Sequence, residues 1–148
     1  MNTTGRAFHL IDIENLLALT RGRPVGARAG ALYDQVVGVG DDDLLTVGAD
    51  VTRLFDISDA FPNARVCSGR GRDGADRALM KAVDIDLIAR RFDTIVIGSG
   101  DNAFVDVAYR ARQHGLNVVV VSRRTSLGRH LAAHADEVIE MPELELAA

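Results

Sequence analysis

Short, almost wholly apolar runs alternate along this chain with segments of helical periodicity, and this alternation constrains the fold more than any other feature of the sequence. A run without polar alternation is typical of a strand covered on both faces, and strands separated by helices are typical of a parallel sheet. The predicted strands are residues 7–12, 44–49, 64–68, 94–98 and 117–122, with a short sixth at 137–141. The predicted helices are residues 29–37, 52–61, 75–91, 102–114 and 126–133. The sequence therefore predicts a three-layer α/β fold with a mostly parallel sheet of five or six strands.

Length and composition fit a single globular domain. The chain has 148 residues, of which 47% are apolar and 26% charged, and domains cluster near roughly 100 to 150 residues. We expect one domain over residues 1–148, with a Gly- and Arg-rich mobile loop at 21–30 and a frayed tail at 142–148. The sequence shows no membrane segment or secretion signal, and the single Cys67 cannot form an internal disulfide. These features predict a cytoplasmic location.

Acidic residues follow predicted strands at the positions where parallel sheets bind ligands. Asp12 ends the first strand, Asp101 follows the fourth, and Asp76 lies in the first turn of the helix after the third. Ligands bind outside the carboxyl ends of the strands of such a sheet, so we expect these carboxylates to share one cleft. Their mutual repulsion is relieved by a cation, and an all-oxygen cluster suits Mg²⁺ or Mn²⁺.

Other acidic residues are predicted to lie too far from this cleft, or to point away from it, to bind the same ion. Asp84 is predicted to lie about 12 Å further along the same helix as Asp76, at 1.5 Å per residue. Asp93 precedes its strand and belongs to the opposite edge, and Asp106 is rotated away from the start of its helix. His9, within an apolar strand, and Cys67 are interpreted as core residues, and His130 and His134 as surface residues.

Arginines gather at the same edge of the predicted sheet. Arg70, Arg72 and Arg77 come after the third strand, and Arg123 and Arg124 after the fifth. The formal net charge is −4, so contact with phosphate must be local rather than a bulk effect of charge. Arginine presents paired donors to phosphate, and a helix starting near Ser126 would direct free N–H groups to the same side. The alternative is that these arginines are ordinary solvated residues.

Three segments resemble the NYN domains, a branch of the PIN-like nucleases. They are HLIDIENLL near the start, DGADRALMKAV in the middle, and the stretch from DTIVIGSGDNAF to DEVIEM at the end. The resemblance covers most of the chain and implies a Rossmann-like sheet of order 3-2-1-4-5, a divalent-metal site and endonucleolytic cleavage of RNA. The positions that match the family's site residues are Asp12, Asn15, Asp76 and Asp101, and Ser99 matches the serine of its Ser-Gly-Asp turn.

One position departs from the family pattern. Many members read Ser-Gly-Asp-x-Asp-Phe, whereas this chain has Ala103 at the second acid. Fewer carboxylates would hold a second metal weakly, and two-metal cleavage of phosphodiesters depends on both ions. Asn102 offers an oxygen nearby. We expect the metal ligands to be Asp12, Asp76 and Asp101, with Asn15 orienting water or phosphate. The candidate contacts to RNA or phosphate are Ser99, Asn102, Arg70, Arg72, Arg77, Arg123, Arg124 and Ser126.

Two other functions remain open at this point. The first is a catalytically degraded NYN module that binds RNA or a protein partner, a second copy of the chain included, because fold does not fix function. The second is an NADP-binding protein, because Gly98, Gly100 and Ala103 fit the pattern G-x-G-x-x-A after a strand. That pattern would place Asp101 where the pyrophosphate should lie, and no substrate domain follows it.

Overall fold

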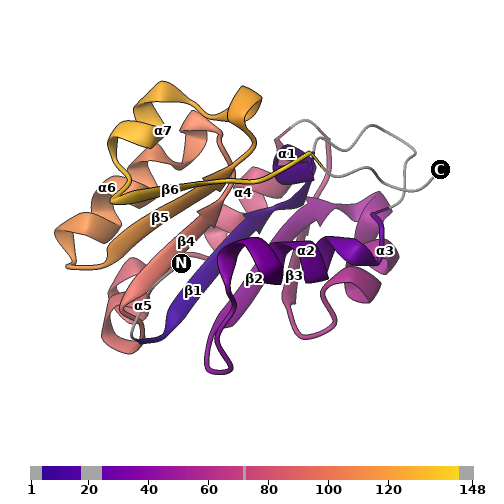
Figure 1. Cartoon of the computed structure of the whole chain (residues 1–148), viewed down its shortest axis with the longest axis horizontal. Coiled ribbons are helices and arrows are strands. Elements are labelled where there is room, and N and C mark those ends of the chain that lie inside the picture. Colours follow the sequence, from indigo (N-terminus) through magenta and orange to yellow (C-terminus); the bar gives the residue numbers. More distant parts are fainter. Residues whose placement is uncertain (1–4, 18–24, 72, 144–148) are drawn as a thin grey trace.

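The computed structural model describes residues 5–17, 25–71 and 73–143. Within these residues, six parallel strands form one sheet in the order β3-β2-β1-β4-β5-β6, so the predicted order is confirmed and extended by one strand (Figure 1). The strands are β1 (Ala7–Asp12), β2 (Leu44–Asp50), β3 (Arg65–Gly69), β4 (Thr94–Gly98), β5 (Asn117–Ser122) and β6 (Glu137–Glu140). Three of these strands have the predicted bounds, and the others differ by one residue at one or both ends.

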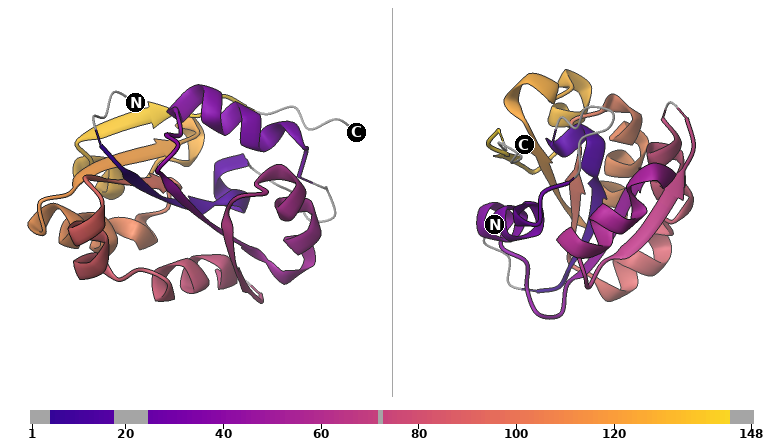
Figure 2. Two further views of the ribbon diagram at one scale, coloured as in Figure 1. Left: turned by 90° about the horizontal axis from the view of Figure 1, so that it is seen from below. Right: turned by 90° about the vertical axis from the view of Figure 1, so that its right-hand side faces the viewer.

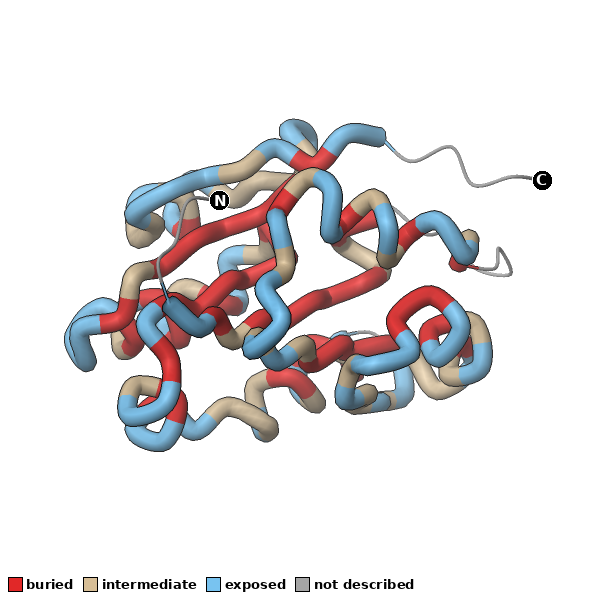
Figure 3. The backbone as a smooth tube through the Cα atoms, turned by 60° about the horizontal axis from the view of Figure 1, so that its bottom comes forward, coloured by how far each residue is buried: buried red, intermediate tan, exposed pale blue. Residues whose placement is uncertain are grey.

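Helices cover both faces of the sheet, which gives the predicted three layers (Figure 2). One face packs against α1 (Ile13–Leu17), α2 (Arg28–Val37) and α3 (Leu54–Ala60), and the other against α4 (Gly74–Lys81), α5 (Ile85–Arg91), α6 (Val105–Gln113) and α7 (Arg129–Ala133). Val119 and Val121 of β5 point into the first core, while Val118 and Val120 point into the second. Central strands are therefore buried along their length, as Figure 3 shows.

Several predicted helices differ from the structure at their ends. The predicted helix 75–91 is two helices in the structure, because the chain turns after Lys81. Asp84 then caps the start of α5, where its Oδ1 accepts a hydrogen bond from the backbone N–H of Leu87. The helix 52–61 starts as a 3₁₀ turn capped by Asp50, whose Oδ1 accepts from the N–H of Thr52 at 3.0 Å. Gly115, with a φ of +83°, follows the end of α6 as predicted.

Two segments were predicted to be mobile or frayed. Residues 28–30 of the predicted loop form the first turn of α2, and 21–24 lie outside the described residues. Of the predicted tail, residues 144–148 also lie outside the described part of the chain. In the part of the chain that is described, none of the helices has the length and apolar character needed to cross a bilayer.

His9 is buried in β1 and belongs to a hydrogen-bonded network, as its position in an apolar strand predicted. Its Nδ1 lies 2.8 Å from the hydroxyl of Tyr33 on α2, and its Nε2 lies 2.9 Å from Oδ2 of Asp43. Asp43 also accepts from the N–H of Ala7, so this carboxylate ties the turn before β2 to the start of β1. Burial lowers the pKa of His9 despite the carboxylate beside it. Cys67, predicted to be a core residue, is only half-buried on the edge strand β3.

Candidate metal centre

The carboxyl ends of β1 and β4 meet where the strand order of the sheet reverses. The two strands are neighbours, with Ile11 opposite Gly98, and their connections leave on opposite sides of this point. A crevice forms at such a position because the helices that follow the two strands pack on opposite faces. Asp12 is the last residue of β1, and Asp101 lies three residues beyond the end of β4.

Close packing of α4 on the sheet brings Asp76 to the same place. Gly48 of β2 lies opposite Asp12, and a Cβ atom on Gly48 would lie 2.4 Å from Cγ of Leu79 on α4. At the end of β3, a Cβ on Gly69 would lie 2.0 Å from the carbonyl oxygen of Gly74. Since side chains at either glycine would push the helix away, these residues allow α4 to lie directly over β2 and β3, with Asp76 beside Asp12 at the end of β1.

Asp12 and Asp76 form a buried, hydrogen-bonded pair of carboxyl groups. Asp12 is 4% exposed and Asp76 is 6% exposed, and their side chains are joined by a hydrogen bond. Burial, then the hydrogen bond and charge of Asp76, and then the charge of Glu14, raise the pKa of Asp12 to about 9. Burial raises the pKa of Asp76 as well. Without a cation, the pair therefore keeps a proton at neutral pH.

A second set of carboxylates lies on the outer side of this pair. Asp73, Asp76 and Asp101 each offer one ligand oxygen, and these atoms lie within 4.8 Å of one another. Asp73, which sits just before α4 with a φ of +60°, was not predicted from the sequence. The Asp-Gly pair at 73–74 before a helix was the available signal, because Asp is one of the few residues enriched in this left-handed conformation. Asp76 belongs to both sets and links them.

Glu14 on α1 also faces this edge and was missed, because a five-residue helix gives no periodicity. Its Oε1 accepts from the N–H of Asp50 at 2.8 Å and lies 3.7 Å from Nε of Arg53. Its Oε2 is buried and has no hydrogen-bond partner among the described residues. Burial raises the pKa of Glu14. The donors gathered here are all carboxylate oxygens, a set that fits Mg²⁺ or Mn²⁺ rather than zinc.

Ser99 and Asn15 connect the carboxylates to the loop after β4. Ser99 is fully buried, donates to Oδ2 of Asp12 at 3.2 Å and accepts from the N–H of Asp101 at 3.2 Å. Oδ1 of Asn15 accepts from the N–H of Gly100 at 3.0 Å. The hydroxyl of Ser99 is thus occupied inside the protein, where a phosphate group does not reach it.

The other predicted phosphate contacts differ in their exposure and in the hydrogen bonds that they make within the protein. Nε and Nη2 of Arg123 donate to the carbonyl oxygen of Asn15 at 3.1 and 3.0 Å. Oδ1 of Asn102 accepts from the N–H of Leu131 at 3.1 Å, which caps α7. The exposed side chains are those of Arg70, Arg77 and Arg124, and Nη2 of Arg77 also donates to the carbonyl oxygen of Arg70 at 3.4 Å. Ser126 is half-buried, and Arg72 lies outside the described residues.

The helix predicted to start near Ser126 is shorter than expected. Residues 124–126 form a 3₁₀ turn, and α7 begins only at Arg129. The reason is a close approach of two loops: Gly128 donates to the carbonyl of Gly100 at 2.7 Å, and a Cβ on Gly100 would lie 2.2 Å from the carbonyl oxygen of Ser126. This packing explains the glycine in the pattern G-x-G-x-x-A without a dinucleotide.

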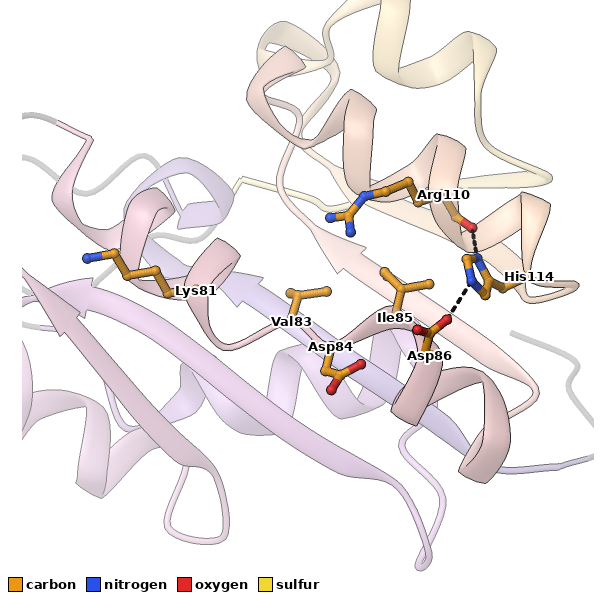
Figure 4. A pocket seen from close by; sticks show the side chains of 7 residues that line it. All are labelled: Lys81, Val83, Asp84, Ile85, Asp86, Arg110 and His114. Atoms are coloured by element: carbon orange, nitrogen blue, oxygen red, sulfur yellow. Dashed lines mark hydrogen bonds and ion pairs between the residues drawn. The ribbon is translucent and has the colours of Figure 1, made fainter.

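A pocket of about 480 Å³ lies apart from the carboxylates of the candidate metal centre, between the α4–α5 turn and α6 (Figure 4). His114 bridges its wall, with Nε2 at 2.7 Å from Asp86 and Nδ1 at 2.8 Å from the carbonyl oxygen of Arg110. The lining residues are Lys81, Val83, Asp84, Ile85, Asp86, Arg110 and His114. None of the predicted site residues lines this pocket.

Comparison with known proteins identifies the family. No curated protein matches the chain. A crystal structure of a protein of unknown function from Vibrio parahaemolyticus has the same fold, with a TM-score of 0.68 at 18% identity over 96% of this chain and 97% of the other. The NYN domain model matches residues 9–144, nearly the whole chain and every carboxylate described above. The chain therefore belongs to the NYN domain family, a nuclease-type branch of the PIN-like domains.

Proposed function

We propose that this protein is a metal-dependent endoribonuclease that hydrolyses phosphodiester bonds of RNA. The observation that carries the proposal is the convergence of Asp12, Asp76 and Asp101 from three separate elements at the reversal point of an NYN fold. Burying two carboxyl groups in contact is costly, so a fold that keeps them there has a use for them. NYN nuclease domains act on RNA and typically use a divalent metal.

Asp12, Asp76 and Asp101 are the residues that would hold the ion, and Asp73 stands beside them on the solvent side. A bound Mg²⁺ or Mn²⁺ would supply positive charge to the reacting phosphate group. Mg²⁺ usually takes only one or two carboxylates and keeps several waters, so Ala103 in place of a second acid does not by itself prevent binding. The carboxylate of Asp73 adds negative charge that Ala103 does not provide.

The remaining side chains position the substrate. Since Oδ1 of Asn15 accepts from Gly100, its NH₂ group is the part left to donate to water or to a phosphate oxygen. Ser99 fixes the orientation of Asp12. The exposed side chains of Arg70, Arg77 and Arg124 would contact the RNA backbone, which provides affinity without reading the bases.

Cleavage of a labelled RNA by the purified protein tests the proposal. Mn²⁺ should support cleavage, EDTA should abolish it, and Asp101→Asn should slow it by about a hundredfold or more, because a lost metal ligand removes several kcal/mol of transition-state stabilisation. Asp106→Asn is the matched control, since the side chain of Asp106 is 75% exposed and its ion pair is with Arg110 on the same helix. Cleavage that survives both EDTA and Asp101→Asn would contradict the proposal.

The second candidate is a degraded module that binds RNA without cutting it. Ala103 favours it, because the position of the second acid now contributes only its N–H, which donates to Oδ1 of Asp101 at 2.9 Å. Retention of RNA on a filter in the presence of Mn²⁺, with no cleavage over the same period, would support this candidate.

A further inference from the structure

Arg123 is placed to hold another residue rather than to receive a ligand. Its side chain is 14% exposed, and two of its nitrogens donate to one acceptor, the carbonyl oxygen of Asn15. The third nitrogen, Nη1, lies 3.7 Å from Oε1 of Glu143. The guanidinium group thus joins the end of β5 to α1, which are 108 residues apart in the sequence.

Asn15 is held a second time through its side chain. Its Oδ1 accepts from the N–H of Gly100 in the loop after β4. A five-residue helix such as α1 is not stable by itself, so its position depends on contacts of this kind. With its carbonyl oxygen fixed by Arg123 and its Oδ1 fixed by Gly100, the NH₂ group of Asn15 has one orientation.

We propose that Arg123 is a positioning residue that acts through Asn15, and not the phosphate ligand that the sequence predicted. The inference rests on the proposed function, because it concerns how the NH₂ group of Asn15 is presented to the substrate. Arginine suits this task better than lysine, since its planar fork donates through two nitrogens in a fixed geometry. The neighbouring Arg124 is exposed and provides the contrast.

The two roles predict different kinetics. A phosphate ligand contributes to affinity and to the salt dependence of binding, whereas a positioning residue contributes to the rate of the bound complex. For Arg123→Ala we expect single-turnover cleavage with Mn²⁺ to slow by about tenfold or more, a factor that corresponds to about 1.4 kcal/mol. Its RNA dissociation constant should stay within about twofold of the wild-type value at each salt concentration. For Arg124→Ala we expect weaker binding of RNA and a smaller salt slope.

Three further measurements make the test sharp. Arg123→Lys keeps the charge and loses the paired donation, so it should bind RNA with wild-type affinity and still cleave it slowly. If the alanine variant does not fold, Arg123→Lys takes its place in the test. Adding Arg123→Ala to Asn15→Ala should cause no further loss of rate, because both changes remove the same function. The amide of Gly100 should exchange with solvent faster in Arg123→Ala, and this readout does not depend on cleavage.

The outcomes separate this inference from the proposed function. If Arg123→Ala and Arg123→Lys weaken RNA binding as Arg124→Ala does, with unchanged exchange at Gly100, Arg123 is a phosphate ligand and the inference is wrong. If the rate losses of Arg123→Ala and Asn15→Ala multiply, Arg123 does not act through Asn15. If the wild-type protein shows no cleavage with Mn²⁺, the proposed function fails, while faster exchange at Gly100 would still support the link from Arg123 to Asn15.

Discussion

Replacing Asp12 by asparagine should stabilise the metal-free protein, although it removes a residue of the candidate metal centre. The asparagine side chain has the same shape, and its oxygen can accept from Ser99 as that of Asp12 does. Its NH₂ group can donate to the carboxylate of Asp76, so the buried pair would keep a hydrogen bond without needing a proton. The variant therefore removes the cost of burying two acids in contact and little else.

The magnitude follows from the pKa of Asp12, which is 3.8 for an ordinary aspartate and about 9 in the folded protein. At pH 7 the unfolded chain has lost this proton and the folded protein holds it, so folding takes up a proton at a cost of about 1.4 kcal/mol for each pH unit above 3.8. That cost is about 4 kcal/mol at pH 7 and about 2 kcal/mol at pH 5. Because the folded-state pKa is raised, stability from this group is fully present below pH 3.8 and is lost as the pH rises toward 9.

Urea unfolding followed by circular dichroism, in EDTA and at pH 5, 6, 7 and 8, measures this effect. We expect Asp12→Asn to raise the free energy of unfolding by about 2 to 4 kcal/mol at pH 7, with a gain that grows with pH. Asp106→Asn, which alters an exposed i,i+4 ion pair, should change it by less than about 0.5 kcal/mol.

Metal should reduce the difference in stability between the two proteins. Mn²⁺ at about a hundred times its dissociation constant should stabilise the wild type by about 2.7 kcal/mol, and Asp12→Asn should gain much less. If Asp12→Asn is no more stable than the wild type in EDTA at pH 7 while Asp106→Asn is neutral, the pair of buried acids is not under electrostatic strain and the reasoning is wrong.

Three other features of the structure can be tested in the same way. Because burial lowers the pKa of His9, its ring should titrate below pH 6.5 by NMR, and stability from this group should be lost as the pH falls below 6.5; a titration at or above 6.5 would contradict this. Gly48→Ala should cost about 1 to 3 kcal/mol in urea unfolding, because its Cβ would press Leu79 and displace α4; unchanged stability would mean that the helix adjusts freely. Asp73→Asn should weaken Mn²⁺ binding by about threefold or more in calorimetry, while Asp84→Asn, which keeps the cap of α5, should not; equal affinities would remove Asp73 from the centre.

The positions of Asp12 and Asp101 could be predicted because backbone topology alone decides them. Both follow apolar strands, and parallel strands end at one edge of a sheet whatever the packing around them. The placement of Asp76 needed only the start of the next helix. By contrast, Asp73 depends on a left-handed residue and Glu14 on a helix of five residues, and neither feature leaves a periodic signal in the sequence.

Contacts between side chains and backbone groups far away in the sequence could not be predicted from the sequence pattern. Arg123 looked like a phosphate ligand because loop arginines often are, but its partner is a carbonyl group 108 residues away. Asn102 caps a helix that begins 27 residues later, and Asp84 ends a helical pattern whose apolar spacing continues through it. For Arg123 and Asn102 the decisive contact forms only once the sheet has brought distant loops together. The contact of Asp84 with the N–H of Leu87 is local, but the apolar spacing gives no sign that it interrupts the helix.

The reversal of strand order between β1 and β4 has a consequence for the synthesis of this protein. Asp12 is made early and Asp76 near the middle of the chain, but Asp101 and the loop that orients Asn15 are made after both of them. Until β4 has left the ribosome, β1 lacks one of its two neighbours in the sheet and the candidate metal centre lacks one wall. A nascent chain that has not yet exposed β4 and Asp101 therefore cannot assemble the complete candidate centre. The topology delays the candidate metal centre until both strands at its reversal point, β1 and β4, have been made.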